Sequence, residues 1–462
     1  KEVKEEKKEE KKEVEKKVEK KAPVKVGMNK PKPLPSLKQV ERELKQLEGN
    51  EPANMAESGK RANASDVTPE QIRMANEPGD LIKKWNEEGF EDLIRITPIM
   101  KTDHRIKFIQ NLTAFNHYAG GMSVEFGTLE QFFRIVRRCQ EMELDCPPTW
   151  EIINRLVKVL CANLPKKEGA DVINRMRKMM RECGRMMLNV TTSKGKLGYA
   201  RRDRDSPEML VRRELAMRIL LGAEDPECLE ELRSMGEAKP DDVEISVQTV
   251  VFSHALNRMG KKEELEKRLN QDMKQQDPRP KDRPFGTEKQ HLIYALASTK
   301  DDAEMVNFVS KIAEARGKST PPADYNPTDL LCAYKGATEN PANIEKVLKI
   351  FEDKSELINF DELPEEIVEQ FGKTQDEKKK LKNEMKSDYL EMCNILAESC
   401  VSKDQWIKFF ETATTYLSYA HRPGSKGFDS EPLMARAFNL EAMLKDKKCV
   451  EWIDEGLKKA GY

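Results

Sequence analysis

The chain has 462 residues, of which 38% are apolar and 35% are charged, and its 81 Lys and Arg nearly balance its 82 Asp and Glu. A net charge of −1 excludes a global field that would attract nucleic acid or an acidic membrane, so electrostatic attraction has to be local. No run of 18 consecutive apolar residues occurs, which excludes a membrane-spanning helix, and no apolar run follows Lys1, so no signal peptide is expected.

The first 66 residues are predicted to form a disordered arm outside the folded body. Residues 1–21 contain only Lys, Glu and three Val, so a helix there would have no apolar face to bury. The segment Lys30–Pro35 contains three prolines and favours an extended polyproline conformation. A short amphipathic helix is predicted over Leu37–Leu47, because its leucines and valine recur at helical spacing.

From residue 67 to the end, the apolar residues recur at helical spacing and no convincing strand alternation occurs. Thr68 is a predicted N-cap, with Pro69 at the first helical position and Gln71 at the capping-box position. The predicted helical stripes cover Ile106–Tyr118, Leu129–Met142, Trp150–Leu164, Val172–Leu188, Met209–Leu221, Val247–Met259, Leu265–Met273, Glu288–Leu296, Met305–Ala315, Pro327–Gly336, Ile344–Phe351, Leu363–Phe371, Tyr389–Cys400, Asp404–Leu417, Pro432–Leu444 and Cys449–Lys459.

Short helices joined by tight turns, with few aromatic residues, predict an all-α fold in the form of an irregular α-solenoid of helix pairs, similar to HEAT or TPR repeats. The interval from Thr287 to Thr328 is 41 residues and neighbouring intervals differ, so no strict repeat period emerges. We expect one helical-repeat domain over residues 67–462, with a candidate subdivision near residues 200–225.

The cysteines and histidines show no pattern typical of a metal or catalytic site. The nine cysteines include no C-x-x-C, and the five histidines include no H-E-x-x-H. A G-x-S-x-G, a Walker loop and a G-x-G-x-x-G are also missing. We therefore expect no catalytic, metal-binding or cofactor-binding residues. The cysteines are interpreted as reduced, buried thiols, which favours an intracellular and cytoplasmic location, or a mitochondrial one if a targeting segment was removed.

Several short segments resemble, in order, the C-terminal helical domain of the aminopeptidase N and puromycin-sensitive aminopeptidase family. The resemblance covers about residues 80–462, and its pieces are short, so their common order carries it. The matching segments are Trp85, His104–Ile109, Pro148–Trp150, Leu197–Tyr199, Leu210–Leu221, Glu224–Cys228, Val250–Phe252, Glu288–Gln290, Ala295–Asp301, Asn340–Pro341, Phe351, Trp406–Phe410 and Trp452.

The resemblance implies a helical bowl with a concave binding surface. In that family the zinc ligands, the catalytic Glu and the Gly-Ala-Met-Glu-Asn motif lie in an upstream domain, and this chain contains none of them. Because zinc polarises the scissile carbonyl and its bound water, the resemblance implies binding without hydrolysis.

Charge is segregated along the chain. Residues 165–218 hold 15 Lys and Arg against 7 Asp and Glu, whereas residues 352–391 hold 13 acids against 7 bases. The basic region is a solvated face, a match within the chain for the acidic segment, or a surface for an anionic partner. The candidate contacts for such a partner are Arg175, Arg177, Lys178, Arg181, Arg201, Arg202, Arg204, Arg212 and Arg213.

Three functions remain open at this point. The favoured one is a non-catalytic scaffold that binds a protein or peptide partner, within a larger complex, on a concave helical surface. The first alternative is an organellar or ribosome-associated RNA-binding protein that uses the basic region 165–218. The second alternative is the C-terminal fragment of a zinc aminopeptidase whose catalytic half lies on another chain.

Overall fold

The computed structural model describes residues 94–113, 126–189, 191–192, 195–201, 205–238, 242–272, 286–317, 325, 327–354, 374–416 and 430–462. All of them belong to one compact unit, Pro52–Tyr462, and the other unit, Lys1–Glu51, lies wholly outside the described residues. The predicted arm, the capped start at Thr68 and the helix predicted over Leu363–Phe371 also lie outside them.

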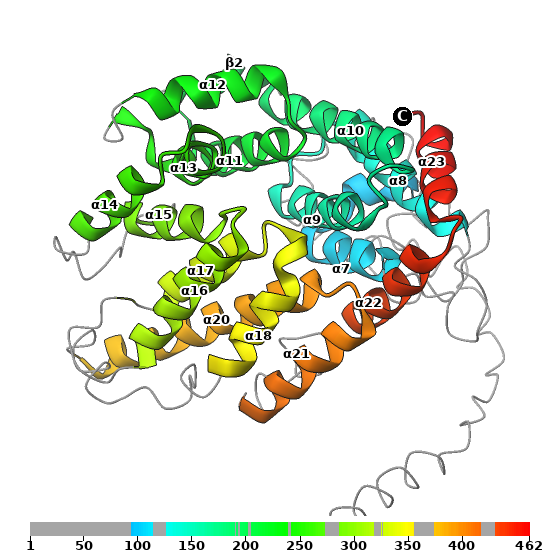
Figure 1. The fold of residues 1–462 in the computed structure, drawn as a ribbon. Helices are drawn as coiled ribbons and strands as arrows, with labels where there is room; N and C mark the ends of the chain where they lie inside the picture. The colour runs from blue at the N-terminus through cyan, green and yellow to red at the C-terminus, as the bar shows by residue number, and fades with distance from the viewer. Residues whose placement is uncertain are drawn as a thin grey trace, which may run out of the picture. The chain divides into compact units, whose positions relative to one another are not determined.

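The predicted all-α class is confirmed (Figure 1). The α-helices are α7 Thr102–Thr113, α8 Phe126–Glu141, α9 Pro147–Asn163, α10 Ala170–Asn189, α11 Pro207–Gly222, α12 Pro226–Glu237, α13 Gln248–Met259, α14 Lys262–Asp272, α15 Glu288–Ala297, α16 Asp302–Gly317, α17 Pro327–Ala337, α18 Ile344–Lys354, α20 Gln375–Ser399, α21 Lys403–Tyr416, α22 Ser430–Lys445 and α23 Cys449–Lys459. Short 3-10 turns are η3 Thr97–Ile99, η6 Ile245–Val247 and η8 Pro341–Asn343, and a two-stranded antiparallel hairpin pairs β1 Thr191–Thr192 with β2 Gly195–Lys196.

Local sequence explains where several helices begin. Ser206 caps α11 by accepting a hydrogen bond from the Met209 N–H, and a proline follows it at the first helical position. Asp225 caps α12 in the same way, also before a proline. Thr287 and Gln290 form a complete capping box at the start of α15.

The helices pack as two sets. In one set, each helix contacts the next member: α7 with α9, then α11, α13, α15, α17, α20 and α22. In the other set, α10, α12, α14 and α16 each pack on a member of the first set, while α18 joins α16 to α21. The last helices return to the first ones, because α22 contacts α7 and α23 contacts α8 and α10. The open array of a solenoid is therefore not confirmed.

Close packing fixes these contacts. Trp150 on α9 is fully buried, and its indole N–H donates a 2.9 Å hydrogen bond to the Leu144 carbonyl, so the ring's polar atom is satisfied. At the contact between α15 and α17, a Cβ atom on Gly336 would collide with the Tyr294 carbonyl oxygen. The absence of a side chain at Gly336 is what lets the two helices approach this closely.

Two helices differ from the sequence prediction. Helix α12 was not predicted, because it buries only Cys228 and Leu232 and has too few apolar residues to form a stripe. Helix α20 begins at Gln375 rather than near Tyr389, since its first turns are rich in Lys and Glu and carry little apolar signal. Helix α11 runs through the candidate subdivision near residues 200–225 and contacts both α9 and α13. Among the described residues, no helix combines the length and the apolar character that a bilayer crossing requires.

Candidate functional site

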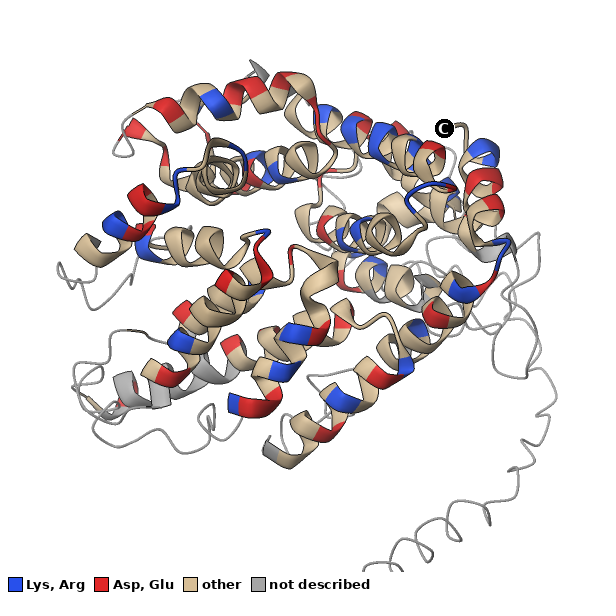
Figure 2. Ribbon diagram, in the orientation of Figure 1, with Lys and Arg blue, Asp and Glu red and all other residues tan. Residues whose placement is uncertain are grey.

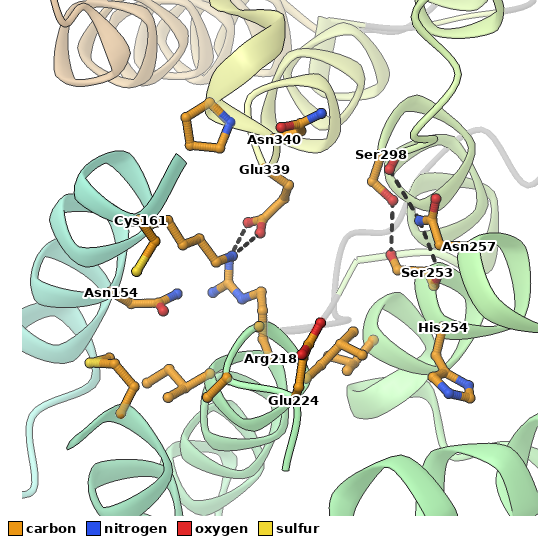
Figure 3. A pocket seen from close by; sticks show the side chains of 18 of the residues that line it. Asn154, Cys161, Arg218, Glu224, Ser253, His254, Asn257, Ser298, Glu339 and Asn340 are labelled. Carbon is orange, nitrogen blue, oxygen red and sulfur yellow. Dashed lines mark hydrogen bonds and ion pairs between the residues drawn. The ribbon is translucent and has the colours of Figure 1, made fainter. Parts of the chain in front are cut away.

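A cavity of about 510 Å³ lies between helices of both sets (Figure 3). Helices α9, α10, α11, α13 and α15 contribute to its wall, together with the turn that leads from α17 into η8. Cavities of about 300–1,000 Å³ have the size of a site that binds a small molecule or a few side chains of a partner. The cavity is therefore large enough to be a binding site.

The cavity wall carries more positive than negative charge. Five described lining residues are cationic, namely Lys158, Arg177, Arg218, Arg258 and Lys300, whereas Glu224 and Glu339 are the carboxylates among them. Each carboxylate is shared by two cations from different helices, which divides the polar lining into two clusters. The surplus of cations gives the cavity a preference for an anionic ligand.

The first of these, the Glu224 cluster, consists of Glu224, Arg177 and Arg258. The Arg177 Nη1 lies 3.0 Å from one Glu224 oxygen, and the Arg258 Nη2 lies 3.2 Å from the other. The three side chains are 34–43% exposed, so the cluster is accessible to solvent. Each guanidinium donates to Glu224 through one nitrogen, so the remaining N–H groups of the two forks are in reach of a further acceptor.

Glu224 has a left-handed backbone, with φ of 55°, directly after the end of α11. The end of a helix usually places glycine in this conformation, because a Cβ atom there costs about 1–2 kcal/mol. The nearby glycine, Gly222, instead lies where a Cβ atom would be 3.2 Å from the Lys158 side chain. The chain therefore carries a carboxylate at a position where backbone conformation alone favours glycine.

The second, the Glu339 cluster, consists of Glu339, Lys158, Arg218 and Tyr294. Glu339 pairs with Lys158, lies 3.4 Å from the Arg218 Nη1, and accepts a 2.5 Å hydrogen bond from the Tyr294 hydroxyl. Burial by itself raises the pKa of Glu339, but Lys158 and Arg218 outweigh it and lower the pKa to about 2. Glu339 is therefore ionised and firmly held at neutral pH.

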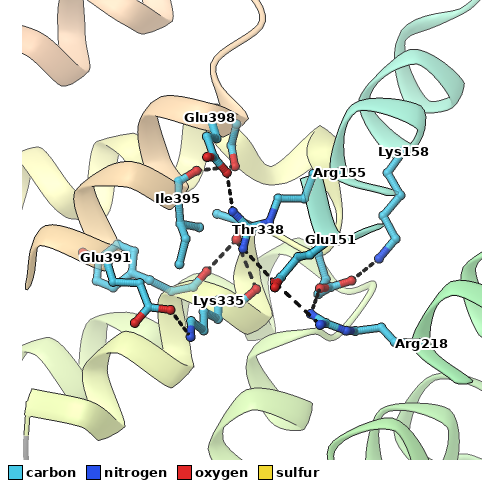
Figure 4. Close-up of polar contacts among 12 residues, drawn as sticks. Glu151, Arg155, Lys158, Arg218, Lys335, Thr338, Glu391, Ile395 and Glu398 are labelled. Atoms are coloured by element: carbon cyan, nitrogen blue, oxygen red, sulfur yellow. Dashed lines mark hydrogen bonds and ion pairs between the residues drawn. The ribbon is translucent and has the colours of Figure 1, made fainter. Parts of the chain in front are cut away.

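Further ion pairs extend from this cluster toward α20 (Figure 4). Arg155 on α9 pairs with Glu398 on α20 and donates a 2.9 Å hydrogen bond to Glu151. The Arg218 Nη2 lies 3.6 Å from the same Glu151 carboxylate. The Arg155–Glu398 and Arg218–Glu151 pairs join different helices, so the network ties α9 to α20 and to α11 beside the cavity.

Uncharged polar groups line the opposite wall. The Asn257 amide donates 3.1 Å hydrogen bonds to the Ser253 and Ser298 carbonyls, and the Ser298 hydroxyl donates to that of Ser253 at 3.3 Å. Across the cavity, Asn154 is 5% exposed, and Figure 3 shows its amide beside Arg218. A side-chain amide offers both a donor and an acceptor, which matches a peptide group.

Two titratable groups of the wall, Cys161 and His254, have shifted pKa values. Burial raises the pKa of the Cys161 thiol to about 11, with the nearby Arg177 opposing it. Burial, and then Arg258 and Arg233, lower the pKa of His254, so its imidazole stays neutral. General acid–base catalysis is most efficient when the pKa lies near the working pH. The wall therefore suits a fixed pattern of charge better than proton transfer.

The sequence-predicted basic residues do not form one surface. Lys and Arg gather on α10 and are interspersed with Asp and Glu on the other helices (Figure 2). Several of them have intramolecular partners: Arg175 with Asp454 at 2.9 Å, Arg177 with Glu224, Arg181 with the Ala223 carbonyl at 2.9 Å, and Arg201 with Glu244 at 3.3 Å. Lys178 is exposed, and Arg202 and Arg204 lie outside the described residues. The basic surplus is thus largely neutralised, by carboxylates outside the segment 352–391.

Arg212 and Arg213, two of the candidate contacts for an anionic partner, are buried. Arg212 is 2% exposed and pairs with Asp145. Arg213 is fully buried, pairs with Asp205, and donates to the Gly198 carbonyl at 3.1 Å. Burial corrects that expectation, because neither guanidinium faces a partner. Arg213 holds the segment after the β1–β2 hairpin against α11, and Arg212 pairs α11 with Asp145 in the turn before α9.

Of the predicted residues, Arg177 alone lines the cavity; the other charged lining residues were missed. These missed residues lie far apart in the sequence: 181 positions separate Lys158 from Glu339, with Arg218 and Arg258 between them. Their spacing therefore gives no sequence signal for a site. Glu224 belongs to the matching segment Glu224–Cys228, but its left-handed backbone is visible only in the structure.

Neither a metal-binding cluster nor similarity to known proteins adds to the description of the cavity. In the part of the chain that the structure describes, no three His, Cys, Asp or Glu side chains gather closely enough to hold a metal ion. No protein-family model matches the chain, and a search of curated proteins finds no match.

Proposed function

We propose that the chain is a non-catalytic helical scaffold that holds a segment of a protein partner in its central cavity. The observation that carries the proposal is the cavity of about 510 Å³, with five cationic and two anionic side chains in its described wall. Asn154 adds a side-chain amide with a donor and an acceptor, which matches a peptide group. Size, charge and amide content together favour an extended acidic segment.

Binding is favoured over catalysis by the state of the lining groups. The Cys161 thiol is protonated at neutral pH, and Glu339 is ionised and held by three partners. A nucleophile needs an adjacent base or a lowered pKa, and Cys161 has a raised one.

The two alternatives have weaker support. RNA binding needs cations that are free to contact phosphates, whereas Arg175 and Arg201 are engaged within the chain. The aminopeptidase-fragment alternative rests on the sequence resemblance.

The proposal is tested by blocking the cavity with a side chain that does not disturb the core. Ala162 lines the cavity and is exposed, so Ala162→Trp narrows the cavity without removing any buried contact. Ala200 is exposed outside the cavity and provides the matched control, Ala200→Trp. Tagged full-length chains are used to capture partners from native extract, with and without nuclease.

The expected result is a protein partner that survives nuclease, is lost with Ala162→Trp and is retained with Ala200→Trp. Crosslinking mass spectrometry then places the partner segment at α9, α11 and α13. Equal capture by both variants contradicts the proposal, and capture that nuclease abolishes favours the RNA-binding alternative.

A further inference from the structure

The Glu224 cluster has a property that the proposed function does not require. Two guanidiniums, from α10 and α13, converge on a carboxylate supplied by the turn between α11 and α12. This carboxylate is partly exposed and belongs to the cavity wall. The two arginines therefore already bind a carboxylate, and that carboxylate belongs to the chain itself.

We propose that the Glu224 cluster is a binding subsite for an acidic side chain of the partner, and that Glu224 is an internal competitor that fills it in the free protein. The inference rests on the proposed function, since it assigns a chemistry to the segment held in the same cavity. Binding then exchanges one carboxylate for another between Arg177 and Arg258.

The backbone supports this exchange. Glu224 has a φ of 55°, and strained residues of this kind persist where the surroundings or a function hold them. The residue sits in the short turn between Gly222, the last residue of α11, and Pro226, the first of α12. Its side chain is 43% exposed, so it can leave the two arginines toward solvent without opening the core.

The remaining charges keep the subsite cationic when Glu224 leaves. Arg177 and Arg258 carry two positive charges, and Lys300 lies in the same cavity wall and is exposed. The Arg181 Nε donates a 2.9 Å hydrogen bond to the Ala223 carbonyl, which secures the turn while the next side chain moves. A carboxylate is favoured over other anions because the two arginines already hold one, at 3.0 and 3.2 Å.

The test uses the full chain and a defined probe, a fluorescein-labelled triglutamate peptide with capped ends, measured by fluorescence anisotropy. Triglutamine with the same label and caps is the neutral control. Glu224→Gln removes the competing charge and keeps the side-chain shape, so we expect it to bind triglutamate about fivefold more tightly than the natural chain. Arg258→Gln is expected to weaken binding about fivefold, with Arg177→Gln as a second variant if it unfolds. Triglutamine affinity is expected to stay the same in all of them.

Three results overturn the inference. The first is equal triglutamate affinity in the natural chain and Glu224→Gln, or no binding by either up to about 1 mM. The second is an equal gain for triglutamine. The third is a clear preference of Glu224→Gln for a capped triphosphoserine peptide, which assigns the subsite to phosphate groups.

The outcome is separable from that of the proposed function. If Ala162→Trp loses its captured partner while Glu224→Gln leaves triglutamate binding unchanged, the cavity binds a partner but this subsite is wrong. If Glu224→Gln gains affinity while Ala162→Trp still captures every partner, the subsite stands and the scaffold proposal fails.

Discussion

Replacing Arg213 tests whether the basic residues of α11 are structural or contact a partner. Arg213 is fully buried, and the Asp205 side chain with which it pairs is 1% exposed. Its guanidinium also donates hydrogen bonds to the Gly198 and Leu197 carbonyls, at 3.1 and 3.4 Å. Arg213→Met keeps the apolar bulk and leaves the Asp205 carboxylate buried without this cation.

Breaking a buried ion pair by removing one partner costs about 3–5 kcal/mol, because the remaining charge is desolvated. We therefore expect Arg213→Met to lower the free energy of unfolding by about that amount. Urea unfolding followed by circular dichroism measures it, since urea does not screen the ion pair as a salt would. Lys178→Met removes an exposed cation from the neighbouring helix and is expected to change stability by less than about 0.5 kcal/mol.

A second substitution separates the charge from the lost volume. In the double variant with Asp205→Leu, the buried carboxylate is gone, so we expect about 1–3 kcal/mol of the loss to be recovered. A loss below about 1 kcal/mol in Arg213→Met, with no recovery in the double variant, would refute the structural interpretation and return Arg213 to the candidate contacts.

Three further predictions concern packing, backbone and pH. Gly336→Ala is expected to destabilise the chain by about 1–3 kcal/mol, because the new Cβ meets the Tyr294 carbonyl of α15. In Gly222→Ala the new Cβ meets only the end of a lysine side chain, so this variant is expected to lose less than half as much stability. Equal losses in the two variants would contradict the packing argument. Glu224→Gly is expected to be about 1 kcal/mol more stable than Glu224→Gln in the same urea assay. Both variants lack the charge, and only glycine adopts the left-handed backbone conformation without strain. The reverse order of stability would exclude strain at this position. The pKa of Glu339 is lowered from 4.5 to about 2, so its contribution to stability is complete above pH 4.5 and is lost as the pH falls toward 2. Acid unfolding of Glu339→Gln is therefore expected to depend less on pH across this window, and an unchanged pH profile would contradict the assigned ion pairs.

The candidate site shows why a cluster of like charges in the sequence was a poor guide to a binding surface. The region 165–218 is basic by count, but its arginines reach carboxylates elsewhere in the fold, such as Asp454 and Glu244. Arg212 and Arg213 are next to each other in a helical stripe and face the interior, since burial there is compensated by Asp145 and Asp205. A count along the chain cannot include partners that folding brings from elsewhere.

The class of fold and most helix positions follow from the order of amino acids alone, because apolar periodicity, N-caps and prolines are local signals. The helix starts at Ser206 and Thr287 are signalled by a few consecutive residues. Helix α12 is not predicted from the sequence, because it buries only two apolar residues. The tertiary structure decided that α22 and α23 pack back on α7 and α8, which depends on contacts between residues more than 300 positions apart. It also decided the site, since Lys158, Arg218 and Glu339 meet only when three helical segments converge. Charge–charge contacts of this kind follow from distance in space, and no local pattern encodes them.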